Sequence, residues 1–184
     1  MPITSPEQRN WWSQPLGGHE KVWLTCVVIL GLSMFIMMPA WHVFGAQNSP
    51  TETYRVSPDY FFQKATAFNA ADGQMSERTQ LGVKPKGDDV YLAALRYGWL
   101  PNAVVLQAGK KYRIHLSSKD VNHGFSIHQS GEPSQKMNFQ VVPGYEFVLP
   151  MTFTDPGTYD VICQEYCGIG HQFMLGKIIV EGGK

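Results

Sequence analysis

The chain has 184 residues, and its 15 basic and 15 acidic side chains leave no formal net charge at pH 7. A neutral chain without a basic stripe cannot neutralise phosphates, so we expect no nucleic-acid partner. Three cysteines allow at most one disulfide, which excludes a disulfide scaffold. The length fits one domain of ordinary size together with a membrane anchor.

The N-terminal part of the chain contains an apolar stretch long enough to span a membrane. Residues 1–21 are mostly polar and predict an arm outside the membrane, whereas residues 22–44 carry no Asp, Glu, Lys or Arg. About 20 apolar residues at ~1.5 Å each cross a bilayer as a helix, and Trp23 and Trp41 suit its two interfaces. A signal peptide has a shorter apolar core of about 7–15 residues, so we expect a retained anchor.

Charges beside this stretch predict its orientation. Arg9 and Lys21 precede it, and the next Lys or Arg after it is Arg55. Because basic residues favour the cytoplasmic side, we expect the N-terminus in the cytoplasm. The sequence thus predicts a single-pass protein of the cell (inner) membrane, in contact with lipid, whose C-terminal part is periplasmic or extracellular.

Residues 45–88 have no strong hydrophobic periodicity and contain several prolines and glycines. Such a segment predicts a connector, with a short helix around Asp59–Phe68. We therefore divide the chain into an arm, an anchor, this connector and a C-terminal domain of residues 89–184.

From residue 89 the pattern changes to short runs of β-branched and aromatic residues, separated by turn residues such as Pro143-Gly144. Many short strands at close spacing indicate a β-sandwich or barrel, so the fold is expected to be mainly β. The predicted strands are Val90–Tyr97, Ala103–Leu106, Tyr112–Ser117, Phe125–His128, Asn138–Val142, Glu146–Thr154, Thr158–Cys163 and Gly176–Glu181.

Soft ligands gather near the C-terminus, in the pattern Cys163-x-x-x-Cys167-x-x-x-His171-x-x-Met174. Thiolate, imidazole and thioether suit copper better than magnesium or calcium, which prefer oxygen. Two thiolates on one loop can each bridge two copper ions, leaving His171 and Met174 as terminal ligands. A second terminal histidine must then come from upstream, and His123, in an Asp-Val-Asn-His-Gly-Phe segment, is the best candidate.

Other interpretations of these residues stay open. Cys163 and Cys167 could instead form a structural disulfide, the usual state of paired cysteines in an exported domain, or bind zinc. His128 is the alternative histidine ligand, although on an extended strand it would face away from His123.

The loop resembles the binuclear copper (CuA) loop of subunit II of haem–copper respiratory oxidases, C-x-x-x-C-x-x-x-H-x-x-M. The upstream Asp-Val-x-His-Gly-Phe and the segment Gly98-Trp-Leu-Pro-Asn102 resemble the same domain, most closely in the B-type oxidases. The resemblance covers about residues 89–182 and the anchor. It implies a single transmembrane helix followed by a cupredoxin-like Greek-key β-sandwich, with the metal ligands on loops at one end.

The resemblance also implies how the ligands are shared. With both cysteines bridging, His123 and Met174 would serve one copper, and His171 and the main-chain carbonyl of Glu165 the other. In the family a glutamate side chain at this position can also reach a magnesium or manganese site shared with subunit I.

The function implied is electron entry. The chain would accept single electrons from a c-type cytochrome or a small copper protein and pass them to haem in subunit I, where oxygen is reduced. No catalytic residue is then expected in this chain. Tyr97 and Trp99 are candidates for electron entry. Glu20 resembles a glutamate at the entrance of a proton channel, and it could equally be a carboxylate favoured at a helix start.

Two further functions share most of these features: a CuA-bearing subunit of a nitric oxide reductase, and a membrane-anchored copper carrier. Within residues 89–184, eight acidic and eight basic side chains cancel (8 − 8 = 0), so no strong field would steer a basic cytochrome. We therefore expect the donor to dock through apolar contacts with a weak dependence on salt.

Overall fold

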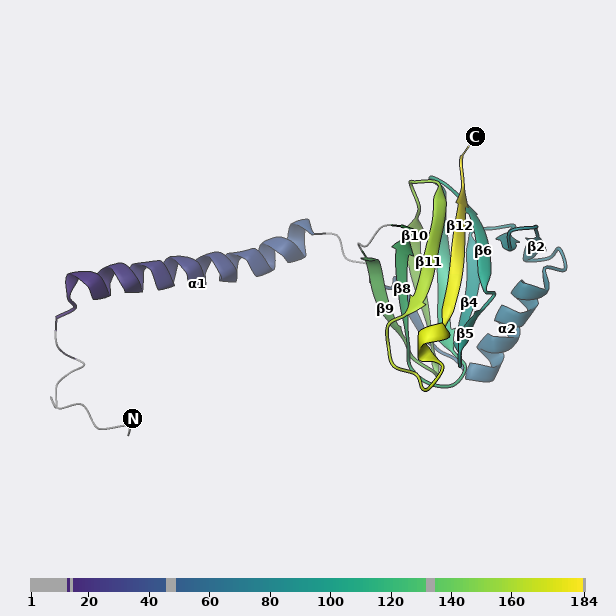
Figure 1. Cartoon of the computed structure of the whole chain (residues 1–184), viewed down its shortest axis with the longest axis horizontal. Helices are drawn as coiled ribbons and strands as arrows, with labels where there is room; N and C mark the ends of the chain where they lie inside the picture. The colour runs from purple at the N-terminus through teal and green to yellow at the C-terminus, as the bar shows by residue number, and fades with distance from the viewer. Residues whose placement is uncertain (1–12, 14, 46–48, 132–134, 184) are drawn as a thin grey trace. The chain divides into compact units, whose positions relative to one another are not determined.

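The computed structural model describes residues 13, 15–45, 49–131 and 135–183. The chain divides into two compact units, Met1–Gln47 and Asn48–Lys184. Figure 1 shows the first as a long helix and the second as a β-sandwich flanked by a helix.

The first unit is built around helix α1, Gly18–Phe44, which begins before the expected Val22. The Glu20 carboxylate accepts a hydrogen bond from the backbone N–H of Gly17 at 2.7 Å and so satisfies a donor that the helix start leaves open. At ~1.5 Å per residue, its 27 residues extend about 40 Å. Among the described residues, α1 is the one helix that is long and apolar enough to cross a membrane.

In the second unit the described strands form two sheets packed face to face, with orders β1-β10-β7-β4-β5 and β2-β3-β6-β12-β11-β8-β9. Neighbouring strands are mostly antiparallel, whereas β4 with β7, β6 with β12 and β3 with β6 are parallel. The elements are β1 Glu52–Arg55, α2 Pro58–Ala70, β2 Ser76–Arg78, β3 Val83–Pro85, β4 Asp89–Leu95, β5 Gly98–Leu100, β6 Ala103–Gln107, β7 Lys111–Ser118, β8 His123–Gln129, β9 Gln135–Val141, β10 Tyr145–Thr152, β11 Gly157–Cys163 and β12 Leu175–Glu181.

Each of the eight predicted strands is present, with ends within three residues of those expected, and the mainly β prediction is confirmed. The short strands β1, β2, β3 and β5 were not predicted, because three or four residues are too few for an alternating pattern. Helix α2 occupies the place of the predicted Asp59–Phe68. Most of the segment interpreted as a connector therefore belongs to the same compact unit as the sandwich.

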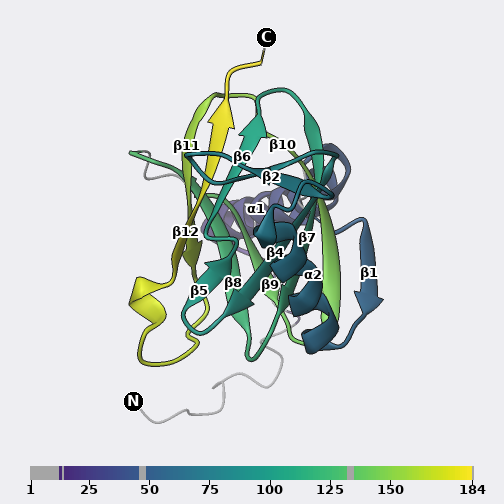
Figure 2. The ribbon, with the colours of Figure 1, turned by 90° about the vertical axis from the view of Figure 1, so that its right-hand side faces the viewer.

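Helix α2 covers the outer face of the first sheet, as Figure 2 shows for strands β4 and β7. Phe61, Ala65 and Phe68 lie on one side of the helix, since they are four and three residues apart, and all three are buried. Phe61 packs with Ala93, and the rings of Phe61 and Phe68 both contact the ring of Tyr91.

The core lies between the two sheets. Alternate residues point inward along each strand: Ile114 and Leu116 on β7, and Phe125 and Ile127 on β8, are all at most 1% exposed. His123 is two residues before Phe125, so the same alternation turns its imidazole inward, where it is 0% exposed. The strand that builds the core thus also places the first candidate ligand.

A polar cluster joins three strands on the outer face of the first sheet. The His115 ring lies between two carboxylates, with Nδ1 2.6 Å from Glu146 and Nε2 3.1 Å from Asp89. Arg113 donates two further hydrogen bonds to Asp89, and the Tyr91 ring stacks on His115 at 4.5 Å. The cluster ties β4, β7 and β10 together.

This cluster predicts a dependence of stability on pH. The hydrogen bond from Arg113 lowers the pKa of Asp89 below its ordinary value of 3.8. Its carboxylate therefore stabilises the fold above about pH 4, and this contribution is lost as the pH falls through the folded pKa. We expect Asp89→Asn to lower the free energy of unfolding at neutral pH, with the difference from wild type shrinking in acid. Urea denaturation across this range measures it, with Asp155→Asn as control; a difference that does not change with pH would contradict it.

Candidate metal centre

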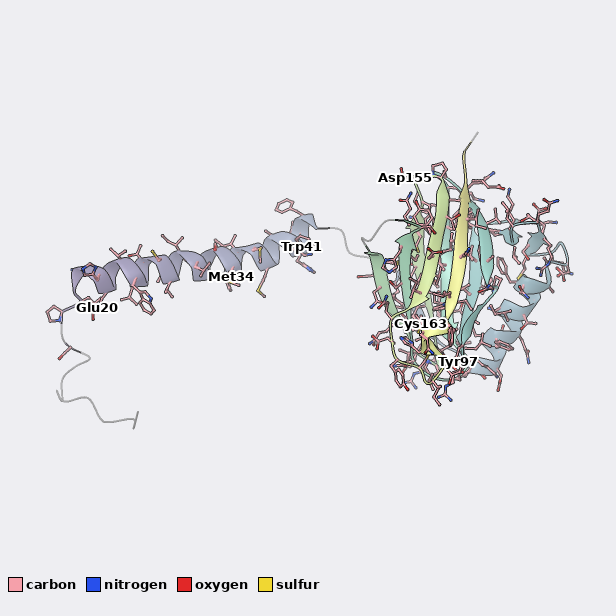
Figure 3. All side chains as sticks on the ribbon, in the orientation of Figure 1. Glu20, Met34, Trp41, Tyr97, Asp155 and Cys163 are labelled. Atoms are coloured by element: carbon pink, nitrogen blue, oxygen red, sulfur yellow. The ribbon has the colours of Figure 1, made fainter. Side chains whose placement is uncertain are left out.

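The candidate ligands come from three segments that meet at one end of the sandwich. His123 is the first residue of β8, Cys163 is the last residue of β11, and the loop between β11 and β12 carries the other ligands. Figure 3 places Cys163 and Tyr97 near this end and Asp155 at the opposite end. Because strands hold both ends of the loop, its ligands are fixed relative to the core.

The two thiols face each other. Their Sγ atoms, in Cys163 and Cys167, are 4.0 Å apart, well beyond the ~2.05 Å of a disulfide bond. The chain's cysteines, which all lie in described segments, are free. At a metal–sulfur length of ~2.3 Å, as in thiolate–zinc bonds, sulfurs up to about 4.6 Å apart can contact the same ion. The pair therefore has the spacing needed to bridge metal ions.

Two imidazoles and a thioether surround this pair. His123 Nδ1 is 3.8 Å from the sulfur of Cys163, while His171 Nδ1 and Met174 Sδ are 3.6 and 3.9 Å from that of Cys167. The ligand atoms of His123, Cys163 and Cys167 lie within 4.8 Å of one another, and these residues are buried. Nitrogen and sulfur donors of this kind fit copper.

The carbonyl and the carboxylate of Glu165 point to different places. The carbonyl accepts a hydrogen bond from the Cys163 thiol at 3.2 Å, so it faces the cluster. The carboxylate accepts a hydrogen bond from Gln140 Nε2 at 3.2 Å, away from the sulfurs. The main chain of Glu165 is thus the part available to the centre.

The two thiols differ in acidity. Burial opposes ionisation of Cys163, but its interactions with His123 and with the backbone of Gly124 and Glu165 lower its pKa to about 6. Burial and the charge of Cys163 raise the pKa of Cys167 to about 11. Cys163 is therefore the more acidic of the two thiols, and metal binding would require both to lose their protons.

Of the two electron-entry candidates, Tyr97 reaches the surface. Its side chain lies on the metal loop, where a Cβ on Gly168 would come within 2.6 Å of the Tyr97 hydroxyl. Tyr97 is 41% exposed, whereas Trp99 is 4% exposed and packs edge-to-face on Phe125 in the core.

The remaining candidates lie outside the ligand cluster. His128 stands near the end of β8 with Nε2 2.9 Å from Ser126 Oγ, on the face opposite to His123. Glu20 belongs to the first compact unit, where it accepts the hydrogen bond at the start of α1.

Sequence reasoning gave no role to Asp120, although this residue belongs to the upstream segment. Its Oδ1 is 2.9 Å from His123 Nε2, the ring nitrogen that faces away from the thiols. The signal was present, because a carboxylate commonly holds the second nitrogen of a metal-binding histidine. The three-residue spacing alone did not show that the turn brings the two side chains together.

Comparison with known proteins places the chain in a family. The family described as "Cytochrome C oxidase subunit II, periplasmic domain" matches residues 83–182. Cytochrome c oxidase subunit 2 of Thermus thermophilus is 30% identical over 166 residues, which cover 89% of this chain and 92% of that protein. The chain belongs to the cytochrome c oxidase subunit II family.

Other relatives agree. Heme-copper oxidase subunit 2 of Aeropyrum pernix is 35% identical over 81 residues, 43% of this chain and 32% of that protein. A chain of a heme-copper terminal oxidase dimer solved by cryo-EM is 28% identical with a TM-score of 0.55, over 89% of this chain and 99% of that chain.

Membership confirms the predicted family, and the two packed sheets that follow one N-terminal apolar helix in the chain confirm the predicted cupredoxin-like sandwich. This chain is thus a subunit of an oxidoreductase complex, and the family implies copper and a subunit I partner. With α1, it is a membrane-anchored, single-pass protein.

The approach of the loop to β8 gives a test of the site's construction. A Cβ on Gly124 would lie 2.9 Å from the backbone nitrogens of Gln164 and Glu165. Because these atoms belong to the main chain, a change of side-chain rotamer cannot relieve the contact. We expect Gly124→Ala to cost about 1–3 kcal/mol in unfolding free energy and to weaken copper uptake. Gly87→Ala, which meets open space, is the matched control. Equal denaturation midpoints for the two variants would contradict the packing argument.

Proposed function

We propose that this chain is the electron-entry subunit of a haem–copper terminal oxidase. It accepts single electrons from a c-type cytochrome or a small copper protein at a binuclear CuA centre. It passes them to haem in subunit I, where oxygen is reduced. The observation that carries the proposal is the pair of buried thiols 4.0 Å apart, with two imidazole nitrogens and a thioether 3.6–3.9 Å from one or other sulfur.

In this proposal Cys163 and Cys167 would hold both copper ions. His123 and Met174 would serve as further ligands of one ion, and His171 and the Glu165 carbonyl as further ligands of the other. When bound, the copper pair supplies a one-electron store. The chain's own contribution is a set of ligands on a loop that strands hold at both ends, with His123, Cys163, Cys167 and Met174 buried, so that little rearrangement accompanies a change of charge. The Glu165 carboxylate, on the Gln140 side, is available to a magnesium ion at an interface with subunit I.

Copper stoichiometry tests the centre. Titrating copper into the reduced, detergent-solubilised chain should give an intense purple species with two coppers per chain. We expect Cys163→Ser and Cys167→Ser each to abolish this species, because a bridge is lost, and Cys26→Ser, on α1, to retain it. One copper per chain with a blue colour would overturn the binuclear centre. A Cys163–Cys167 disulfide, seen as a mass lower by two hydrogens in protein never exposed to reductant, would favour the structural interpretation.

An apolar rim surrounds the metal end and suits the electron donor. Five apolar or aromatic side chains on or beside the metal loop are 41–88% exposed: Tyr97, Tyr166, Ile169, Phe173 and Leu175. Together with the balanced charges of residues 89–184, this rim favours a donor that docks by burying apolar surface. Tyr97, in contact with the metal loop, is then the preferred point of electron entry.

The rim predicts how donor oxidation responds to charge. We expect Ile169→Lys to raise the KM for the reduced donor several-fold, because it places a charge within an apolar contact. Thr154→Lys adds the same charge at the opposite end of the sandwich and should leave KM unchanged. Steady-state oxidation by the intact complex at several ionic strengths provides the measurement. A steep fall of the wild-type rate with salt would contradict apolar docking.

We propose that residues 1–21 form an arm whose last residues begin α1, that 22–44 form the anchor, and that 89–184 form the copper domain. Residues 45–88 connect the two, with their described part from residue 49 in the same compact unit as the sandwich. The N-terminus is placed in the cytoplasm and the copper domain outside the membrane, following the positions of Arg9 and Lys21. Glu20 then lies at the cytoplasmic end of α1, where a proton channel into subunit I would begin.

The intact complex tests the terminal acceptor. Purified from membranes, it should contain a haem-bearing subunit, consume oxygen with reduced cytochrome, and keep its copper in a mild chelator. Turnover of nitric oxide without oxygen consumption would favour the reductase. Ready loss of copper without any haem-bearing partner would favour a copper carrier.

A further inference from the structure

Asp120 contacts two separate parts of the metal end. Its Oδ1 lies 2.9 Å from His123 Nε2, and its Oδ2 accepts a hydrogen bond from the backbone N–H of Arg96 at 2.9 Å. The N–H of Val121 also donates to Oδ1, at 2.7 Å, which holds the carboxylate in this orientation. One side chain therefore joins a candidate copper ligand to the turn between β4 and β5.

The first contact determines which nitrogen of His123 faces the thiols. A carboxylate accepts hydrogen bonds, so Nε2 carries the hydrogen and donates it to Asp120. Nδ1, 3.8 Å from Cys163 Sγ, is then the nitrogen whose lone pair can bind metal. Because the His123 side chain is 0% exposed, loss of Asp120 would leave a buried N–H without this acceptor.

The second contact, from the Arg96 N–H to Asp120 Oδ2, fixes the backbone next to Tyr97 of the apolar rim. Arg96 directly precedes Tyr97, whose ring lies against Gly168 and Gly170 of the metal loop. Two residues before Arg96, the carbonyl of Ala94 in β4 accepts a hydrogen bond from the N–H of Lys119 at 2.9 Å, so the strand that leads into the turn is also held. A backbone fixed at Arg96 keeps the Tyr97 ring in place over the loop.

We propose that Asp120 is a positioning residue that locks the His123 ring and the Tyr97 turn to each other, so that the copper ligand and the entry-side aromatic keep one fixed arrangement. This deepens the proposed function and rests on it for the copper measurements. The negative charge of Asp120 beside His123 also favours the oxidised copper centre, which is the more positive state. Loss of this charge therefore raises the reduction potential of the centre.

The first test needs no copper. In the detergent-solubilised, reduced full chain, we expect the Arg96 amide of Asp120→Ala to exchange hydrogen about 10-fold faster than in wild type, because a hydrogen bond to a charged acceptor is lost. Asp120→Asn keeps the size of the side chain but has one acceptor oxygen, so it should retain the hydrogen bond to either His123 or Arg96 and lose the other. This variant replaces Asp120→Ala in the test if the alanine variant does not fold. Asp155→Asn is the matched control at the opposite end of the sandwich.

The second test uses copper-loaded protein. We expect Asp120→Ala and Asp120→Asn to bind copper about 10- to 100-fold more weakly than wild type, with an altered absorption spectrum and a higher reduction potential. Asp155→Asn should match wild type in all three. A merely structural role would lower thermal stability without moving the potential or the spectrum.

The outcomes separate the two proposals. If wild type takes up no copper pair, the proposed function fails, while Arg96 exchange still decides whether Asp120 holds the turn. If wild type binds two coppers but the Asp120 variants match Asp155→Asn in exchange, spectrum and potential, the role of Asp120 is overturned.

Discussion

Closure of the metal loop between two strands is the constraint on which the site depends. The N–H of Cys163 donates to the carbonyl of Met174 at 3.2 Å, so the first and last candidate ligands of the loop lie side by side where β11 meets β12. The N–H of Gln164 donates to the carbonyl of Gly124 at 3.2 Å and ties the loop to β8. Residues far apart in the loop thereby reach the same small volume as His123.

This closure suits an electron store better than a site for exchangeable metal. The deep ligands His123, Cys163 and Met174 are at most 3% exposed, whereas apolar side chains beyond them face solvent. Ligands held by paired strands and a packed core move little when charge changes, because the interior behaves as a close-packed solid. In the proposed function, a donor that docks on the rim would therefore approach the metal without the ligands having to move apart.

Helix α2, which precedes the longer strands of the sandwich, also contributes contacts near the metal end. Helix α2 packs on β4 through Phe61 and Ala93, and its first turn carries Asp59, which pairs with Lys119 at the end of β7. Lys119 precedes Asp120, so α2 braces the turn from which the carboxylate reaches His123 and Arg96. A region without strong sequence periodicity thus contributes to the geometry of the metal end.

The sequence by itself determined the apolar helix and the longer strands, and it predicted the candidate ligands, because residue spacing within a loop and alternation along a strand are local properties. It also predicted that His128 would face away from His123. Only the tertiary structure decided that Trp99 is buried while Tyr97 lies on the loop, that residues 50–88 pack on the sandwich, and that Asp120 reaches both His123 and Arg96. Those features depend on contacts between segments that are distant in the chain. The packing of the two sheets on each other, and of α2 on the first sheet, fixes the positions of these segments, so no local sequence pattern predicts the contacts.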